Sequence, residues 1–428
     1  MNVVKYPKQA LLKALLARPH IDDNNVENAI KTILSNVKHK GDKALFDYSY
    51  QFDRVKLTSL KVSAKELADA EKQLPADLKK AIKVAYSNIK KFHKAQQQKT
   101  VKIETTKGVV CWRESRPIEN VGLYIPGGSA PLFSTVLMLA TPAAIAGCKR
   151  VVLCTPADKN GNINPAILFS AQLCGVTEIY KVGGAQAIAA MAYGTETIKP
   201  VNKIFGPGNR YVTTAKQLVQ NEGVAIDMPA GPSEVMVVAD GTAVPAFVAA
   251  DLLSQAEHGP DSQVVLVAFD EKFAKAVQQE VKVQLDELFR KDIAAQALEN
   301  SKIILVKTEQ DAIVIINEYA PEHLILAIKN ENYFMQNTIN AGSIFLGNYT
   351  PESAGDYASG TNHTLPTNGY AKVYGGVSLD SFVKKITVQK ISAKGIENLG
   401  STIEIMAAAE GLDAHKNAVT VRLNQLKK

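Results

Sequence analysis

The feature that most constrains this fold is a regular alternation of short apolar runs with longer helical patterns between residues 121 and 346. Parallel strands need long connections, so the alternation predicts parallel sheets whose strands are joined by crossover helices. The pattern restarts once, which divides it into two blocks of similar layout. The predicted strands are 121–125, 150–154, 178–182, 203–205 and 225–228 in the first block, and 234–239, 263–269, 302–306, 324–328 and 343–346 in the second.

The segments between these strands have apolar residues at helical spacing. The predicted helices are 132–146, 165–174, 185–192, 210–221, 245–258, 271–288, 309–319 and 331–337. Outside the blocks, we expect helices at 1–19, 22–98, 396–410 and from Asp413 onward, a hairpin at 102–118 with Trp112 in the core, and a strand at 378–392. The sequence therefore predicts an α/β fold with two parallel-sheet domains that are Rossmann-like but incomplete.

Composition excludes several classes of protein. The chain is 46% hydrophobic and 21% charged, as in ordinary globular proteins, and its 49 basic residues are scattered, which argues against nucleic-acid binding. The N-terminus has no signal-peptide core, and Pro126, Pro131 and Pro142 interrupt the longest uncharged run, so we expect a cytoplasmic protein without a membrane span. The four cysteines form no CxxC pair. They are interpreted as small buried residues, with a catalytic thiol as the alternative.

Three glycine-rich turns each follow a predicted strand and precede a predicted helix. They begin after Tyr124, Val182 and Phe205, and they contain Gln186 and Asn209. In one parallel sheet, such turns converge on the carboxyl edge, where helix N-termini favour phosphate groups. None matches G-x-G-x-x-G, and each alone is also typical of a tight turn. Together they make a nucleotide site plausible.

Two short motifs carry candidate acid–base or ligand groups. Gln255 and His258 lie three residues apart near a helix end, where they either bind a ligand or simply complement the helix dipole. Glu322 and His323 precede a predicted strand, as an acid–base pair or as a polar strand entrance. Pro321 is expected to push Ala320 toward extended geometry.

Isolated polar residues complete the set of candidates. Asp356 lies in the irregular stretch 348–376, and His415 lies near the C-terminus. Together with Gln255 and His258 they are acceptable zinc ligands, although an amide ligand is unusual and spacing gives the set only weak support. Ser233 is either a turn residue or a ligand contact.

Eight blocks, taken together, closely resemble the histidinol dehydrogenase family over nearly the whole chain. They are 121–131, 181–190, 204–209, 227–234, 253–259, 320–324, 353–363 and 414–419. The match is loose in the N-terminal region. The resemblance implies oxidation of L-histidinol through L-histidinaldehyde to L-histidine, the last step of histidine biosynthesis, with two NAD and one zinc ion per subunit.

The resemblance also assigns roles to individual residues. It implies Glu322 and His323 as the catalytic pair, and Gln255, His258, Asp356 and His415 as zinc ligands. The zinc ligands and the catalytic pair also belong to the implied substrate site, together with Ser233, His363 and Glu410; the implied NAD contacts are Tyr124, Gln186 and Asn209.

The family is a homodimer whose terminal segments reach across, so the resemblance implies that His415 serves the partner's site. We therefore expect residues 1–19 to be an N-terminal helical dimerisation segment and residues 378–428 a C-terminal one. Residues 20–120 together with 235–377 are expected to form one domain, with a helical N-terminal part, and residues 121–234 a nucleotide-binding domain. The apolar stripe of Leu11, Leu12, Leu15 and Leu16 is expected to pack across the dimer.

Two other classes of protein compete with this interpretation. A zinc hydrolase could use the same ligands, with Glu322 activating a metal-bound water, but hydrolysis does not need three glycine-rich turns. A non-enzymatic dimerising or small-molecule-binding protein would use the histidines only structurally.

Overall fold

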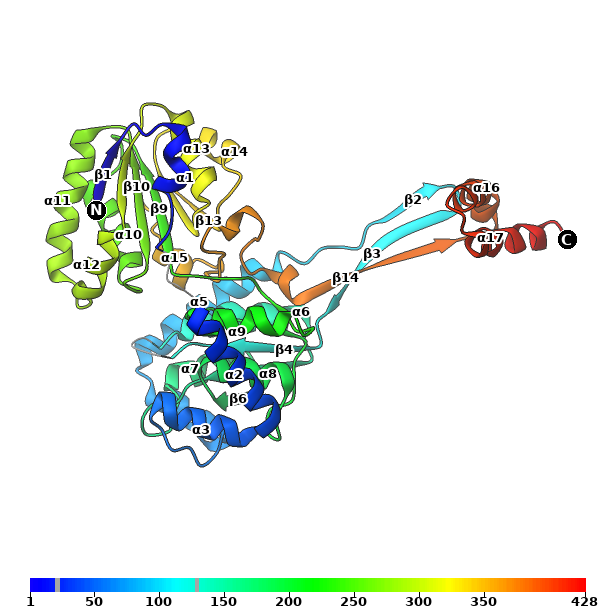
Figure 1. Ribbon diagram of the computed structural model, residues 1–428, viewed down its shortest axis with the longest axis horizontal. Coiled ribbons are helices and arrows are strands. Elements are labelled where there is room, and N and C mark those ends of the chain that lie inside the picture. Colours follow the sequence, from blue (N-terminus) through cyan, green and yellow to red (C-terminus); the bar gives the residue numbers. More distant parts are fainter. Residues whose placement is uncertain (20–23, 128–130) are drawn as a thin grey trace.

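The computed structural model describes residues 1–19, 24–127 and 131–428. Two parallel sheets, each covered by helices on both faces, form the body, and a long arm leaves it (Figure 1). Every strand and helix predicted within 121–346 is present, with ends that agree within two residues. The fold is α/β with two parallel-sheet domains, as predicted.

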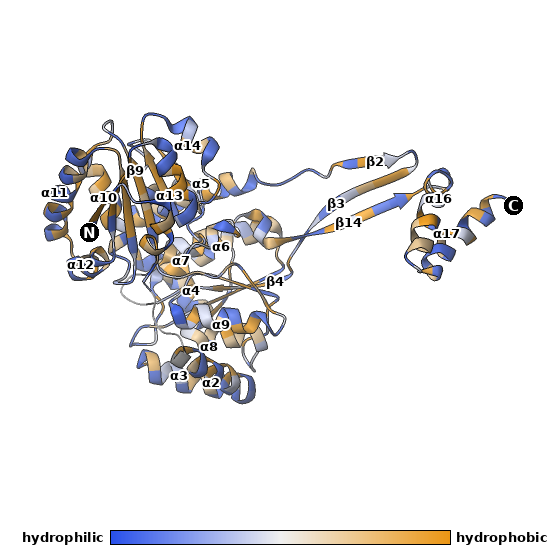
Figure 2. Ribbon diagram, turned by 45° about the horizontal axis from the view of Figure 1, so that its top comes forward, coloured by the Kyte–Doolittle hydropathy of each residue, from blue (hydrophilic) through white to orange (hydrophobic). Residues whose placement is uncertain are grey.

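The first sheet has six parallel strands in the order β1-β11-β10-β9-β12-β13. Their bounds are β1 Asn2–Lys5, β9 Glu234–Ala239, β10 Gln263–Ala268, β11 Lys302–Leu305, β12 His323–Ala327 and β13 Ser343–Leu346. Helices α10 (Pro245–Ala256), α11 (Glu271–Glu287) and α12 (Lys291–Glu299) cover one face. Helices α1 (Leu12–Leu15), α13 (Glu309–Tyr319) and α14 (Glu331–Asn337) cover the other. The strands are apolar on both faces because both are buried (Figure 2).

The second sheet has five parallel strands in the order β6-β5-β4-β7-β8. Their bounds are β4 Asn120–Tyr124, β5 Arg150–Thr155, β6 Glu178–Lys181, β7 Lys203–Phe205 and β8 Ala225–Ile226. One face is covered by α4 (Ala64–Ala70), α5 (Ala76–Lys94), α6 (Phe133–Ala146) and α7 (Pro165–Leu173). The opposite face is covered by α2 (Asn24–Lys40), α3 (Asp42–Asp53), α8 (Gly184–Tyr193) and α9 (Arg210–Gln220).

The N-terminal helices pack differently from the grouping expected from the sequence. Helices α2 to α5 share their cores with the five-stranded sheet, whereas the sequence grouped residues 20–120 with residues 235–377. The apolar stripe of an amphipathic helix shows that it must be covered, but not which sheet covers it.

The first 19 residues also differ from the predicted helix. They form β1 at the edge of the six-stranded sheet, a 3-10 turn (Gln9–Leu11) and the short α1. Leu12 and Leu16 are 5% and 4% exposed and pack on this sheet, whereas Leu11 is 59% exposed. The expectation that this stripe packs across a dimer was wrong for its buried residues, because the same chain covers them.

The arm consists of three antiparallel strands and two helices at its tip (Figure 1). Strands β2 (Lys102–Thr106), β3 (Val109–Pro117) and β14 (Val383–Ile391) lead to α16 (Ala393–Ala409) and α17 (Asp413–Leu426). The predicted hairpin is therefore present, but Trp112 is only half-buried, and its indole N–H donates to Glu114 Oε1 at 2.8 Å. A single three-stranded sheet cannot enclose the indole ring of Trp112 as a core of two layers would.

Short elements complete the chain. Two helices were not predicted from the sequence: α12, between the predicted helix 271–288 and strand 302–306, and α15 (Glu352–Tyr357), within the stretch expected to be irregular. The 3-10 turns span Glu71–Gln73, Tyr370–Lys372 and Leu379–Phe382. Among the described residues, no helix combines the length and apolar character needed to cross a membrane.

Candidate functional site

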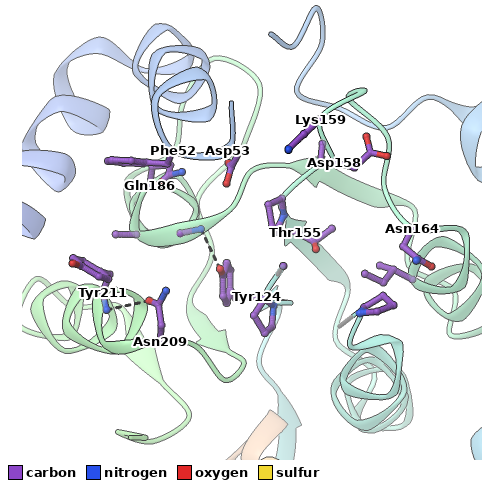
Figure 3. A pocket seen from close by; sticks show the side chains of 18 of the residues that line it. Phe52, Asp53, Tyr124, Thr155, Asp158, Lys159, Asn164, Gln186, Asn209 and Tyr211 are labelled. Carbon is purple, nitrogen blue, oxygen red and sulfur yellow. Dashed lines mark hydrogen bonds between the residues drawn. The ribbon is translucent and has the colours of Figure 1, made fainter. Parts of the chain in front are cut away.

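A cavity of about 910 Å³ opens at the carboxyl edge of the five-stranded sheet (Figure 3). The strand order reverses between β4 and β7, and such switch points are where open α/β sheets bind ligands. All three glycine-rich turns reach the cavity, through Gly127, Gly184 and Asn209. Their predicted convergence is confirmed, although Gly128 and Ser129 of the first turn lie outside the described residues.

The three residues predicted to contact a nucleotide all line this cavity. The hydroxyl of Tyr124 accepts the Gly184 N–H at 3.1 Å, and burial raises the pKa of Tyr124 to about 12, so it stays neutral. Asn209 caps α9, because its Oδ1 accepts the backbone N–H groups of Tyr211 and Val212. Gln186 is buried in the first turn of α8. The cavity therefore presents two helix N-termini, which suit an anionic ligand.

A buried ion pair fixes the third turn. Asp227 Oδ2 accepts the Gly206 N–H at 2.8 Å, Lys216 donates to the Gly206 carbonyl at 2.9 Å, and Lys216 pairs with Asp227. Gly206 has a φ of 125°, and a Cβ there would lie 2.1 Å from the Tyr124 carbonyl oxygen. Only glycine fits where β4 and β7 end this close together.

A second group of polar residues lies at the amino edge of the six-stranded sheet. His323 is the first residue of β12, and its Nδ1 lies 3.1 Å from the carbonyl oxygen of Glu234. A carbonyl only accepts, so Nδ1 carries a proton and Nε2 faces Asp356, whose Oδ1 is 3.4 Å away. Glu322 Oε2 accepts the Glu234 N–H at 2.8 Å. The predicted pair is thus held on both sides by one residue of β9.

The backbone before this pair differs from the expectation. Ala320 lies in the left-handed region with a φ of 51°, not in extended geometry. It caps the C-terminus of α13, and its N–H donates to the Ile316 carbonyl at 2.7 Å. The helix cap outweighs the local preference that Pro321 imposes.

Burial and the charges around His323 shift its pKa in opposite directions. Burial alone would lower the pKa of His323, but the carboxylates of Glu322, Asp356 and Glu352 outweigh burial and raise the pKa well above its usual value. The pKa of Asp356 is lowered, because the histidines near it, led by His323 and including His258, outweigh the effect of burial. The site therefore favours an ionised Asp356 beside a protonated imidazole.

Helix α10 presents the predicted ligand pair, although the helix ends at Ala256, two residues earlier than predicted. Gln255 is 1% exposed, and its Nε2 donates to Glu352 Oε1 at 2.8 Å, while its Oε1 has no hydrogen-bond partner. His258 lies just beyond the helix end. A buried amide oxygen without a hydrogen-bond partner, at the helix end that His258 follows, fits a metal ligand.

Glu352 is a site residue that the sequence analysis missed. It lies in the first turn of α15, and Ser254 and Gln255 both donate to its Oε1, at 2.6 and 2.8 Å. Burial, with a smaller effect from Asp356, raises the pKa of Glu352 to about 8. Its spacing of four residues before Asp356 would indicate a shared face only on a helix, and no helix was predicted there.

The remaining predicted residues fall into two groups. Ser233 precedes β9 at the amino edge, and His363 joins the two domains through Asp356 O at 2.9 Å and Thr135 Oγ1 at 3.0 Å. Glu410 caps the C-terminal end of α16 and His415 lies in α17, and both residues are exposed. These two helices form the tip of the arm, away from the body (Figure 1). Within one chain, no group of three or more His, Cys, Asp or Glu that could hold a metal occurs among the described residues.

Three of the four cysteines, Cys148, Cys154 and Cys174, are poor candidates for a nucleophile. All four are free. Burial raises the pKa of Cys148 to about 11 and the pKa values of Cys154 and Cys174 to about 12. Thiols that stay protonated are poor nucleophiles, which supports the interpretation as packing residues.

Comparisons with known proteins point in one direction. The family model described as histidinol dehydrogenase matches residues 16–423. A histidinol dehydrogenase of Bacteroides thetaiotaomicron is 59% identical over 427 residues and 100% of both chains, and one of Escherichia coli K12 is 54% identical over 97% of this chain and 95% of its own. The crystal structure of histidinol dehydrogenase from Elizabethkingia anophelis matches with a TM-score of 0.98 and 57% identity, covering 100% of this chain and 99% of that one.

The glycine at the switch point provides a test of the cavity's geometry. Gly147, which ends α6, is the control for Gly206: its φ is 83°, and a Cβ added there would meet nothing within 4 Å. Gly147→Ala should therefore lower the free energy of unfolding by about 1–2 kcal/mol, from backbone strain alone. Gly206→Ala should cost a further ~1–3 kcal/mol, because the methyl must displace the Tyr124 carbonyl. Unfolding in urea measures both. Equal losses would show that the close approach of β4 and β7 is not a constraint.

Proposed function

The chain belongs to the histidinol dehydrogenase family of NAD-dependent oxidoreductases, and from this premise we propose that it oxidises L-histidinol through L-histidinaldehyde to L-histidine with two NAD and one zinc ion per subunit. This reaction would be the last step of histidine biosynthesis. The observation that carries the proposal is the Glu322–His323 pair, which Glu234 holds with His323 facing the carboxylate of Asp356. Four free cysteines suit a reducing compartment, which supports a cytoplasmic location.

Gln255, His258, Asp356 and His415 are the proposed zinc ligands. Glu352 accepts the amide N–H of Gln255, which leaves the oxygen of that amide as the donor to the metal. When bound, zinc would hold the substrate's imidazole and amine, and NAD would accept the hydride. The chain's own contribution is then to position the alcohol carbon and to move protons.

His323 is the proposed acceptor of the alcohol proton. Its Nδ1–H is donated to the Glu234 carbonyl, so Nε2 is the nitrogen left to accept a proton. Glu322, Asp356 and Glu352 raise the pKa of His323, and a cation held by Asp356 would offset part of that negative charge. Such a cation therefore favours the neutral imidazole that a base requires.

Glu322 is the proposed base for the second oxidation, in which a water must add to the aldehyde. The Glu234 N–H holds Oε2, which orients the carboxylate without protonating it. Ser233, His363 and Glu410 are proposed substrate contacts, and Tyr124, Gln186 and Asn209 are proposed NAD contacts. The His363–Thr135 contact supports one site that spans both domains, because α6 follows the turn that lines the cavity.

We further propose a homodimer in which the arm of each chain completes the site of its partner. The arm exposes apolar side chains, including Ile405 and Met406 at 68% and 60%, and such a surface favours a partner. His415 lies in α17 of this arm and Glu410 at the end of α16, and the tip that these helices form lies away from both sheets of its own chain (Figure 1). A two-fold dimer would use both arms equivalently.

The first test is the stoichiometry of NADH formation. Purified, zinc-replete protein with excess NAD should form two NADH per L-histidinol, measured by absorbance. A chelator should abolish the activity and added zinc should restore it. A zinc hydrolase or a non-enzymatic binding protein would form no NADH, and that result would exclude the proposed function.

The separate roles proposed for His323 and Glu322 predict that Glu322→Gln slows the two oxidation steps to different extents. The amide still accepts the Glu234 N–H but is no longer a base, so oxidation of histidinaldehyde should fall by about 10²–10⁴-fold and oxidation of histidinol by much less. Rates of the two half-reactions, measured separately with each substrate, test this expectation. An equal fall in both would contradict the assigned roles.

Shared sites predict recovery of activity when two inactive variants are mixed. His258→Ala damages the body and His415→Ala damages the arm, so a hybrid dimer contains one intact site. After unfolding and refolding together, random pairing should restore about one quarter of the wild-type sites, because half of the dimers are hybrids. Each variant refolded alone is the control. Absence of recovery would mean that each chain uses its own His415.

A further inference from the structure

We infer that Arg18 and Glu234 form a positioning device for the Glu322–His323 pair, through which the N-terminal segment sets the geometry of the reaction. Neither residue was a candidate from the sequence. The inference rests on the proposed function, because it assigns these residues to the same acid–base chemistry.

Arg18 holds two different segments at once. Its Nη2 donates to Glu234 Oε2 at 2.7 Å and to the Tyr319 carbonyl at 2.8 Å, and its Nε pairs with Glu234 Oε1. The guanidinium carbon also lies 4.1 Å from the centre of the Tyr319 ring. The guanidinium fork therefore fixes the first residue of β9 against the end of α13.

Both of these segments lead directly to the acid–base pair. The backbone N–H of Glu234 donates to Glu322 Oε2 at 2.8 Å, and its carbonyl accepts Nδ1–H of His323 at 3.1 Å. Tyr319 ends α13 only three residues before Glu322. Arg18 thus fixes the backbone that orients the pair and the turn that carries it.

Among the described residues, Arg18 is the one charged group that pairs with the Glu234 side chain. It is 2% exposed, and Oε1 also accepts the Asn368 N–H at 2.8 Å. Burial and the nearby Glu322 raise its pKa, and Arg18 opposes them. Without Arg18, a buried carboxylate would lie unpaired beside Glu322, and the segment would rearrange to relieve it.

The chain offers a matched control for the anchoring of the N-terminal segment. Lys5 pairs with Glu271 at 2.8 Å, with both side chains about half exposed, and ties the same segment to the same domain. Exposed ion pairs of this kind contribute little to the free energy of unfolding. Lys5→Met therefore removes a charge pair from the segment without touching the route to Glu322 and His323.

The test compares Arg18→Met, Arg18→Lys, Glu234→Gln and Lys5→Met by steady-state kinetics. Arg18→Met and Glu234→Gln should lower kcat by about 10- to 100-fold while the KM for histidinol changes less than about 3-fold, because a misplaced pair impairs the chemistry more than binding. Arg18→Lys keeps the charge but loses the fork, so its kcat should lie between those of Arg18→Met and the wild type. Lys5→Met should leave both parameters unchanged.

Zinc content separates a positioning effect from general damage to the site, and the thermal midpoint shows which variants fold. We expect all four variants to keep the wild-type zinc content. If Arg18→Met does not fold, Glu234→Gln still tests the inference. Its amide oxygen keeps one acceptor for Arg18, so the variant should fold, but the charge and the second acceptor that fix the guanidinium are lost. Unchanged kcat in the folded variants, an equal loss in Lys5→Met, or loss of zinc would overturn the inference. Failure of the wild type itself to form NADH would instead reject the proposed function.

Discussion

The pairing of β12 with β9 is the constraint on which the acid–base site depends. The register sets His323 opposite Val235, so Glu322 and His323 meet the backbone of Glu234, one residue earlier on β9. A shift of one residue would turn His323 to the opposite face of the sheet. Strands β9 and β12 are themselves fully buried in the core of the sheet. The packing of the core therefore determines the orientation of the polar pair.

The two sheets present opposite edges to the functional region. In the five-stranded sheet the carboxyl edge carries the cavity, whereas in the six-stranded sheet the amino edge carries the polar residues. The carboxyl edge of the six-stranded sheet also has a switch point, between β9 and β12. There the Asp240 carboxylate, at the end of β9, accepts the Lys329 N–H after β12 at 2.9 Å.

The sequence predicted what depends on local pattern and missed what depends on partners. Strand positions followed from apolar runs, and the convergence of three glycine-rich turns followed from parallel topology. The sequence did not show that α2 to α5 cover the five-stranded sheet, because an amphipathic stripe does not identify its partner. Glu352, Glu234 and Arg18 were missed for a related reason. Each is one charged residue among many, and only tertiary contacts show that it is buried and paired.

The arm has the structure that a shared site would require. Delivering His415 to another chain is costly if the arm is flexible, because its freedom would be lost on assembly. Nine residue pairs join β14 to β3, and α16 begins against the β2–β3 turn, where a Cβ on Gly395 would lie 2.3 Å from the Gly108 carbonyl. Helix α17 packs on α16 at Gly400, which Leu423 approaches closely. His415 is therefore fixed relative to the strands, so the proposed dimer would bring it to the site with little further ordering.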